Sequence, residues 1–245
     1  MRGTRPVLAQ LARWFWMLAA LAVAASGCAW SPKSINSQGV GLYHQGNYDG
    51  ALALFHQAVS LDPNNPNFYY NLARVHHQKG RQTKDTGELE KAETYYNLCL
   101  DRDSNHTDCY RSLAVLLVEQ GRKQDAFTLL ERWNMRSPHL ADPKIELARL
   151  YEEAGDLTAA KEKLLAALQV EPNNPRALAA LGHVRERQGD LVQALADYKR
   201  SLAVNPAQPK VALRAAALQG QGVVAQVPVV NPPTTLATRP GPLFR

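Results

Sequence analysis

Small, apolar and polar positions recur along the middle of the chain with a period of 34 residues. In residues 175–208 the recurring positions hold Gly182, Gly189, Leu191, Ala194, Tyr198, Ser201 and Pro206. In residues 141–174 the equivalent positions hold Ala148, Gly155, Leu157, Ala160, Leu164, Ala167 and Pro172. Apolar residues three and four apart lie on one face of a helix, and small side chains let two helices cross closely. Each period therefore predicts two antiparallel helices, with a glycine ending the first and a proline following the second.

The pattern fits five blocks, and the second block is longer than the others. The blocks span residues 32–65, 66–106, 107–140, 141–174 and 175–208. The surplus of block two is RQTKDTG, residues 81–87, in which Asp85 is followed by Glu88, a spacing typical of a helix N-cap. We therefore expect the extra residues to lie in the turn between the two helices of that block. Block three holds Trp133 where other blocks hold a small residue, so its second helix is expected to lie further out or to tilt.

These positions resemble the tetratricopeptide repeat, a helical hairpin with small residues at two fixed positions, an aromatic residue in its second helix and a proline near its end. The resemblance covers residues 32–208 and implies an all-α fold, namely a right-handed α-solenoid of five helix-turn-helix repeats. A single hairpin cannot bury its own apolar face, so each repeat needs its neighbours. Residues 209–219, PKVALRAAALQ, are therefore expected to form a helix that caps the last repeat.

The last residues, 220–245, differ in composition from the repeats. They contain five prolines and no acidic residue, and they show no helical periodicity. This composition predicts a disordered, proline-rich tail. Binding of an acidic or wall-associated partner by this tail is the alternative.

The N-terminal residues are typical of an export signal. Positive charge comes first, followed by an apolar run from Trp14 to Ala25 and then small residues before Cys28. A helix over that run would be roughly 18 Å long, too short for a hydrocarbon core of ~30 Å. The stretch Ala25-Ser26-Gly27-Cys28 resembles a bacterial lipobox, which implies cleavage after residue 27, lipidation of Cys28 and a short linker over residues 28–31.

Acyl chains on Cys28 would tether the chain to a membrane surface without a spanning segment. Because Ala29 follows the cysteine, the resemblance implies a lipoprotein that faces the periplasm, at the outer membrane. Two alternatives stay open, a plain signal peptide with a coincidental cysteine and an uncleaved anchor. Either alternative still exports the remaining chain.

The composition adds little that points to another class of function. Of the 245 residues, 45% are hydrophobic and 20% are charged, as in a folded globular protein. The net charge of +6 comes from the two ends, because residues 32–208 hold 21 basic residues against all 22 acidic ones. A nucleic-acid-binding face is therefore not indicated by charge count.

No sequence motif supports catalysis. The patterns GxSxG, HExxH, GxxxxGK[ST] and GxGxxG are absent, and the glycines stand singly at turn positions of the repeat. We therefore expect no enzyme activity, no cofactor and no small-molecule substrate.

Blocks two and three contain histidines and cysteines, the residue types that bind metal ions such as zinc. That set comprises His76, His77, Cys99, His106 and Cys109. Cys99 falls on a small-residue core position and His76 and His77 on the end of a helix, so no metal is expected. Because export leads to an oxidising compartment, a disulfide between Cys99 and Cys109 is a hypothesis that needs Cα atoms within about 7 Å.

The resemblance also implies a concave groove lined by the first helices of the repeats. Its inner-face positions are Tyr70, Asn71, Arg74, His77, Arg111, Glu146, Arg149, Glu152, His183, Glu186 and Arg187. Arginines beside aromatic and amide groups suit a peptide carboxylate or backbone. Ordinary solvated helix positions are the alternative for any one of them. The carboxylate clamp of some chaperone-binding members is not matched, because the required lysine and asparagine are replaced by Asn36 and Val40, and the basic pair by Asp108 and Ser112.

These features together favour a non-catalytic, membrane-tethered scaffold that binds a peptide or protein partner in the groove. The chain resembles tetratricopeptide lipoproteins that assist pilus secretin assembly, which implies a role in envelope or surface-appendage assembly. The alternative is an adaptor or regulatory subunit for an envelope hydrolase or protease.

Overall fold

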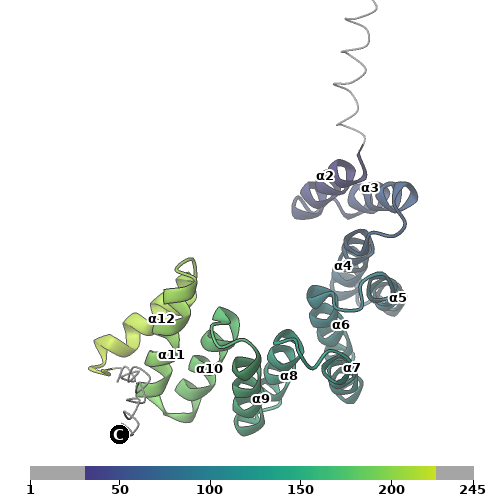
Figure 1. Cartoon of the computed structure of the whole chain (residues 1–245). Helices are drawn as coiled ribbons and strands as arrows, with labels where there is room; N and C mark the ends of the chain where they lie inside the picture. The colour runs from purple at the N-terminus through teal and green to yellow at the C-terminus, as the bar shows by residue number, and fades with distance from the viewer. Residues whose placement is uncertain (1–30, 225–245) are drawn as a thin grey trace, which may run out of the picture. The chain divides into compact units, whose positions relative to one another are not determined.

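The computed structural model describes residues 31–224, and within them every regular element is an α-helix. The signal segment, Cys28 and residues 225–245 of the tail lie outside the described residues, so the predictions made for them are not addressed. Figure 1 labels the helices α2 to α12. Within residues 31–224, no helix has the length and hydrophobicity needed to cross a bilayer.

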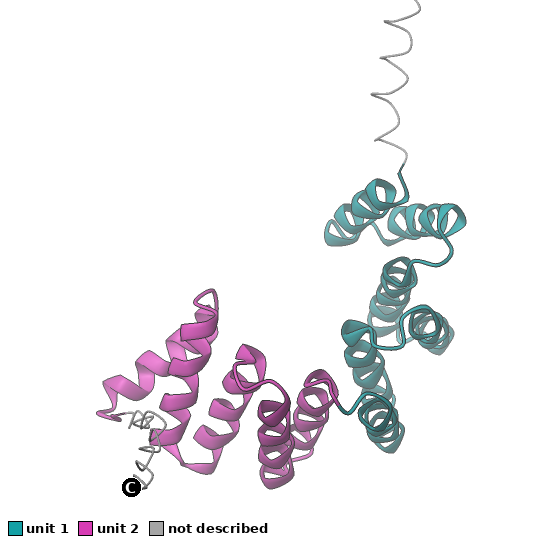
Figure 2. Cartoon of the chain, viewed as in Figure 1, with its two compact units in different colours: residues 1–138 teal, residues 139–245 magenta. Residues whose placement is uncertain are grey.

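The chain divides into two compact units, residues 1–138 and residues 139–245, coloured separately in Figure 2. The described helices of the first unit are α2 (Pro32–His44), α3 (Tyr48–Leu61), α4 (Pro66–Thr83), α5 (Thr86–Arg102), α6 (Thr107–Glu119) and α7 (Lys123–Arg136). Those of the second unit are α8 (Asp142–Glu153), α9 (Leu157–Val170), α10 (Pro175–Gln188), α11 (Leu191–Val204) and α12 (Pro209–Gly220). The 34-residue pattern does not predict this division, because it runs through both units unchanged.

The helices begin and end at the residues that the pattern marks. Asn174 is the N-cap of α10, and its side chain accepts hydrogen bonds from the backbone N–H groups of Arg176 and Ala177. The turns after α8 and α10 place Gly155 and Gly189 at φ 85° and 86°, a conformation that side chains with a Cβ rarely adopt. The predicted hairpins therefore form for the expected local reasons.

The turn between the two helices of block two lies within the seven extra residues, as expected, but only two of the seven form it and the others are helical. Helix α4 continues beyond Gly80 to Thr83, and α5 begins at Thr86, so only Lys84 and Asp85 separate the two helices. Residues 81–83 contain no proline and continue the helical hydrogen bonding, which stabilises them more than an open loop would. The expected cap is present, since the Asp85 carboxylate accepts a hydrogen bond of 2.8 Å from the Gly87 N–H.

Each unit buries its small and apolar positions between adjacent helices. In the first unit Ala51, Phe55, Leu72 and Val75 form one cluster across α3 and α4. In the second unit the cluster across α8, α9 and α10 consists of Ala141, Ile145, Ala148, Ala160, Leu164, Ala167, Ala177, Leu181 and Val184. Helix α12 covers the last hairpin with Ala215 and Leu218. The prediction of an all-α fold of five helical hairpins with a closing helix is confirmed.

Trp133 is fully buried in the first unit. Its indole stacks on the ring of Tyr110 in α6, with ring centroids 4.1 Å apart, and its Nε1 donates a hydrogen bond of 3.0 Å to Asn105 Oδ1. A face-on stack with a paired N–H accommodates a large residue at a position that is small in the other blocks.

Candidate functional site

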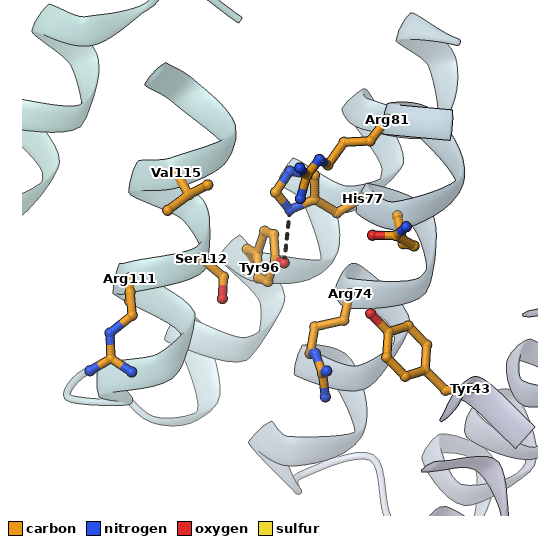
Figure 3. A pocket seen from close by; sticks show the side chains of 9 residues that line it. Tyr43, Arg74, His77, Arg81, Tyr96, Arg111, Ser112 and Val115 are labelled. Carbon is orange, nitrogen blue, oxygen red and sulfur yellow. Dashed lines mark hydrogen bonds between the residues drawn. The ribbon is translucent and has the colours of Figure 1, made fainter. Parts of the chain in front are cut away.

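A cavity of about 220 Å³ opens between the helices of the first unit. Its walls come from α2, α4, α5 and α6, as Figure 3 shows from close by. The lining residues are Tyr43, Arg74, His77, Gln78, Arg81, Tyr96, Arg111, Ser112 and Val115. Three arginines and two tyrosines in one concave site suit an anionic or aromatic group of a ligand.

Arg74 is held at this cavity by aromatic rings. Its guanidinium carbon lies 4.6 Å from the centroid of the Tyr43 ring and 5.6 Å from that of Tyr70. No carboxylate among the described residues forms an ion pair with it, since none of the charge pairs of residues 31–224 includes Arg74. Cation–π contacts orient the guanidinium without neutralising its charge. Arg74 therefore presents a positive charge that a ligand anion can pair with.

His77 and Tyr96 form a rigid polar wall of the same cavity. His77 lies 3.3 Å through Nδ1 from the Tyr96 hydroxyl and 2.9 Å through Nε2 from the Glu119 carboxylate. Burial raises the pKa of Tyr96, so its hydroxyl stays protonated and available as a hydrogen-bonding group. Both polar atoms of the His77 ring are thus engaged within the chain, which fixes the ring rather than leaving it for a ligand.

The other positions predicted in this unit have different roles. Arg111 lines the cavity and also pairs with Asp108 at 2.9 Å. Tyr70 lies at its edge, where its ring centroid is 6.2 Å from that of Tyr96. Asn71 is 8% exposed and donates a hydrogen bond of 2.8 Å to Asn36, so it joins α4 to α2 instead of facing a ligand.

Sequence reasoning missed several residues that line the cavity. Tyr43 comes from the first repeat, for which no groove position was predicted, and Tyr96 comes from the second helix of block two, whereas the predicted groove positions lie on first helices. Arg81 belongs to the extra residues of block two and reaches the cavity because α4 continues past Gly80. The signal for Arg81 was its helical spacing from Arg74 and His77, which places all three on one face of a helix that extends to Thr83.

The positions predicted in the second unit pair with one another. Glu146 is 1% exposed, and its carboxylate accepts from Arg176 at 2.6 Å and from Arg149 at 3.3 Å. The expectation that Glu146 faces a partner is therefore corrected, because two guanidinium groups occupy its carboxylate inside the fold. Glu152 accepts from Arg187 at 3.0 Å and lies 2.8 Å from His183 Nδ1.

Glu186 completes the set of paired charges in this unit. Its carboxylate accepts a hydrogen bond of 2.7 Å from the Tyr198 hydroxyl and pairs with Arg214 of α12 at 3.1 Å. A smaller cavity of about 170 Å³ lies beside it and is lined by Ala179, His183, Tyr198, Lys210, Val211 and Arg214. Of the predicted positions only His183 lines that cavity. Most of the charged residues predicted to line the groove in the second unit therefore form ion pairs within the chain.

The second unit also has an open cavity of about 370 Å³ lined by Leu165, Leu168, Gln169, Pro172, Leu181, Arg185, Asp197 and Arg200. Its buried carboxylate, Asp197, already pairs with Arg185 at 2.5 Å. Burial raises the pKa of Asp197, an effect that Arg185 opposes. This cavity is thus mainly apolar with a compensated charge, unlike the cationic cavity of the first unit.

The repeated hairpins, the glycine turns and the concave cavity define a helical-repeat protein. Models of the tetratricopeptide repeat match residues 66–106 and 145–211, and a model described as a TPR repeat matches residues 41–80. Together these matches span more than half of the chain. The chain belongs to the tetratricopeptide repeat family.

Known proteins and structures show the same relationship. The chain is 27% identical over 171 residues to human protein O-mannosyl-transferase TMTC1, covering 67% of this chain and 18% of that protein. It is 24% identical over 174 residues to a TPR repeat-containing protein of Methanocaldococcus jannaschii, covering 66% of this chain and 29% of the relative. The chain thus spans less than a third of the length of these two relatives.

Two solved structures share the fold over most of the chain. The thermophilic TPR protein TTC0263 of Thermus thermophilus has a TM-score of 0.57 at 26% identity, with 77% of this chain and 99% of that chain covered. The pilF protein of Pseudomonas aeruginosa has a TM-score of 0.53 at 19% identity, covering 78% and 84%. The tetratricopeptide fold is a protein–protein interaction scaffold that binds protein or peptide partners. It is typically non-catalytic, although one distant relative is named as a mannosyl-transferase.

Proposed function

We propose that this chain is a non-catalytic, membrane-tethered scaffold that captures a peptide or protein partner in the cavity of its first unit. The observation that carries the proposal is Arg74, a cation held between Tyr43 and Tyr70 with no carboxylate partner among the described residues. A guanidinium that stacks on aromatic rings keeps its donors available for a bidentate pair with a carboxylate. The neighbouring Arg81 and Arg111 also line the cavity, where each already pairs with a carboxylate, Glu119 at 3.5 Å and Asp108 at 2.9 Å.

The chemistry of the cavity favours an acidic peptide segment or a peptide's terminal carboxylate as the bound group. Guanidinium groups bind carboxylates through paired hydrogen bonds, and the ring of Tyr43 offers a surface for an apolar side chain beside that carboxylate. The internally paired charges of the second unit make it the less suitable place for such a ligand. No motif of a catalytic site supports turnover by the chain itself.

The membrane tether is the second part of the proposal and rests on the sequence around Cys28. Lipidation there would hold the scaffold at the envelope surface, facing the periplasm, where it would serve envelope or surface-appendage assembly. Incorporation of labelled palmitate into the wild type and its loss in Cys28→Ala tests this part. Absence of label from the wild type would contradict the tether while leaving the groove proposal intact.

Binding by the groove is tested in two steps with the detergent-solubilised chain. Partners are first isolated by affinity capture, and peptides from them are then titrated by fluorescence anisotropy in free-carboxylate and amidated forms. The proposal expects Arg74→Glu to weaken binding of acidic peptides by about tenfold or more, equivalent to about 1.4 kcal/mol. Arg132→Glu is the matched control, since Arg132 is exposed on α7 and does not line the cavity.

The outcome also separates the two classes of scaffold. Structural envelope proteins among the captured partners would support a role in assembly, whereas an envelope hydrolase or protease would support the adaptor alternative. Equal affinity of the wild type and Arg74→Glu for every captured peptide would refute the groove as the binding site.

A further inference from the structure

Three residues with metal-binding side chains lie together at the junction of α5 and α6. Cys99 is in the last turn of α5, His106 is the N-cap of α6, and Cys109 is in the first turn of α6. The candidate ligand atoms of the three side chains all lie within 4.8 Å of one another. The two cysteines are fully buried and joined as a disulfide, with Cα atoms 6.8 Å apart.

The hydrogen bonds of His106 determine which of its ring nitrogens has a lone pair. The backbone N–H of Cys109 donates to Nδ1 at 3.2 Å, so Nδ1 is an acceptor and carries no proton. In the neutral ring Nε2 is then protonated, and it donates to Asn67 Oδ1 at 3.2 Å. A metal ion on Nδ1 would replace the Cys109 N–H as the partner of that lone pair. The hydrogen bond from Nε2 to Asn67 would then fix the tautomer and the ring orientation, as a second hydrogen bond does in metal-bound histidines.

We propose that the reduced form of this protein binds one Zn²⁺ ion through Cys99 Sγ, Cys109 Sγ and His106 Nδ1, so that the disulfide and the metal are alternative states of one site. A dithiol reductant supplies two electrons and two protons to the disulfide, becomes a cyclic disulfide itself and leaves two cysteine thiols. The metal ion then displaces both thiol protons and is held by two thiolates and one neutral imidazole. Water occupies the fourth position of the tetrahedron.

The spacing of the backbone suits both states. A Cα separation of 6.8 Å is at the upper end of the range that a disulfide spans. Two thiolates on one tetrahedral zinc, at Zn–S distances of about 2.3 Å, are about 3.8 Å apart, so the sulfurs must separate after reduction. A wide backbone spacing allows that separation by rotation of the side chains. Thiolate and imidazole ligands together favour Zn²⁺ over hard cations such as Mg²⁺ or Ca²⁺.

The other two histidines of the block do not belong to this site. His76 is engaged with Glu88 at 2.8 Å, and His77 with Tyr96 and Glu119. The five-residue set considered from the sequence therefore reduces to a group of three. The centroid of the His106 ring lies 5.4 Å from that of Tyr70, so this site lies next to the edge of the cationic cavity.

Titration of the full chain with Co²⁺ tests the proposal, because tetrahedral Co²⁺ with thiolate ligands absorbs in the visible and near-ultraviolet ranges. The protein is reduced with dithiothreitol, freed of reductant without oxygen and titrated alongside the oxidised protein. The expected result is one Co²⁺ per reduced chain with thiolate charge-transfer bands, displaced by Zn²⁺. The oxidised protein is expected to show no such bands.

The ligand assignment is tested with His106→Asn and a matched control. Asparagine still caps a helix N-terminus but provides no imidazole, so Co²⁺ affinity should fall about tenfold or more. His44→Asn changes an exposed histidine at the end of α2 and should leave the affinity unchanged. Cys109→Ser should lower the thiolate charge-transfer intensity per chain by about half or more, because one of the two thiolate ligands is lost.

Several results would overturn the proposal. These are the absence of Co²⁺ bands in the reduced chain, equal affinity of His106→Asn and the wild type, and equal binding by the oxidised protein. Far-ultraviolet circular dichroism shows whether reduction alone unfolds the chain. If it does, Co²⁺ should restore the helical signal, because metal binding stabilises the folded state, and failure to restore it also counts against the site.

Discussion

Gly182 in α10 lies directly against the ring of Tyr198 in α11. A Cβ at Gly182 would be 2.7 Å from Tyr198 Cδ1 and 3.2 Å from the backbone oxygen of Ala194. Carbon atoms in favourable contact are about 3.5–4.0 Å apart, so neither neighbour leaves room for a methyl group. The close crossing of these two helices therefore depends on the absence of a side chain at this position.

Gly182→Ala is expected to destabilise the protein by about 1–3 kcal/mol, because the added methyl forces the Tyr198 ring or the α11 backbone to move. Urea unfolding followed by circular dichroism measures the change. Gly41→Ala is the matched control, since nothing lies within 4 Å of a Cβ at Gly41 in α2 and alanine favours the helix. An unchanged midpoint for Gly182→Ala would contradict the close crossing.

Trp133→Ala is expected to destabilise the protein by about 3–5 kcal/mol. The substitution empties a fully buried site, removes the stack on Tyr110 and leaves Asn105 without the indole N–H. Thermal and urea unfolding measure this loss. Met135→Ala in the same helix, where the side chain is 71% exposed, should change stability by less than about 0.5 kcal/mol. Similar effects of the two substitutions would show that Trp133 is not packed as described.

Most of the fold could be predicted from the sequence because its determinants are local and repeated. Ala160 and Ala167 are 0% exposed at the small positions of their block, and Gly155 takes the positive φ that the turn requires. The length of α4 was not predicted, because a glycine at position 80 suggested a helix end although the residues after it continue the helix. The division into two units was missed because an unchanged period gives no local signal of it.

The candidate site was predicted less completely than the fold. Helical register places Arg74 and Arg111 on an inner face, and both line the cavity. Register does not determine which charges pair, and pairing removed Glu146 from the set of groups available to a ligand. Contacts between residues of neighbouring repeats, such as Arg74 with Tyr43, decide which predicted positions remain open. Those contacts follow from side-chain packing that a single sequence does not specify.

Glu88 predicts a pH-dependent contribution to stability in the first unit. Hydrogen bonds from Lys91 and His76 lower the pKa of its carboxyl group from 4.5 to about 2, against the opposing effect of burial. A pKa that is lower in the folded state stabilises the fold above pH 4.5, and this stabilisation is lost as the pH falls toward 2. Glu88→Gln should therefore destabilise the protein near pH 7 by about 1 kcal/mol, with the difference from wild type vanishing near pH 2.

Urea unfolding at a series of pH values measures this difference. Glu90→Gln is the matched control, because Glu90 is exposed on the same helix and its carboxylate forms no ion pair among the described residues. The control should follow the wild type at every pH. A Glu88→Gln difference that stayed constant down to pH 2 would mean that the ionised carboxylate is not the stabilising group.

Reduction of the Cys99–Cys109 disulfide in metal-free solution should lower the free energy of unfolding by about 2–4 kcal/mol, because the bond closes a loop with a sequence separation of 10 residues. The bond also joins α5 to α6, so its loss should act on the first unit, where both helices lie. Urea unfolding with and without reductant measures the effect. The double variant Cys99→Ala, Cys109→Ala should have the lower stability under both conditions and no response to reductant. A wild-type protein equally stable in both conditions would show that the two cysteines are not bonded in solution.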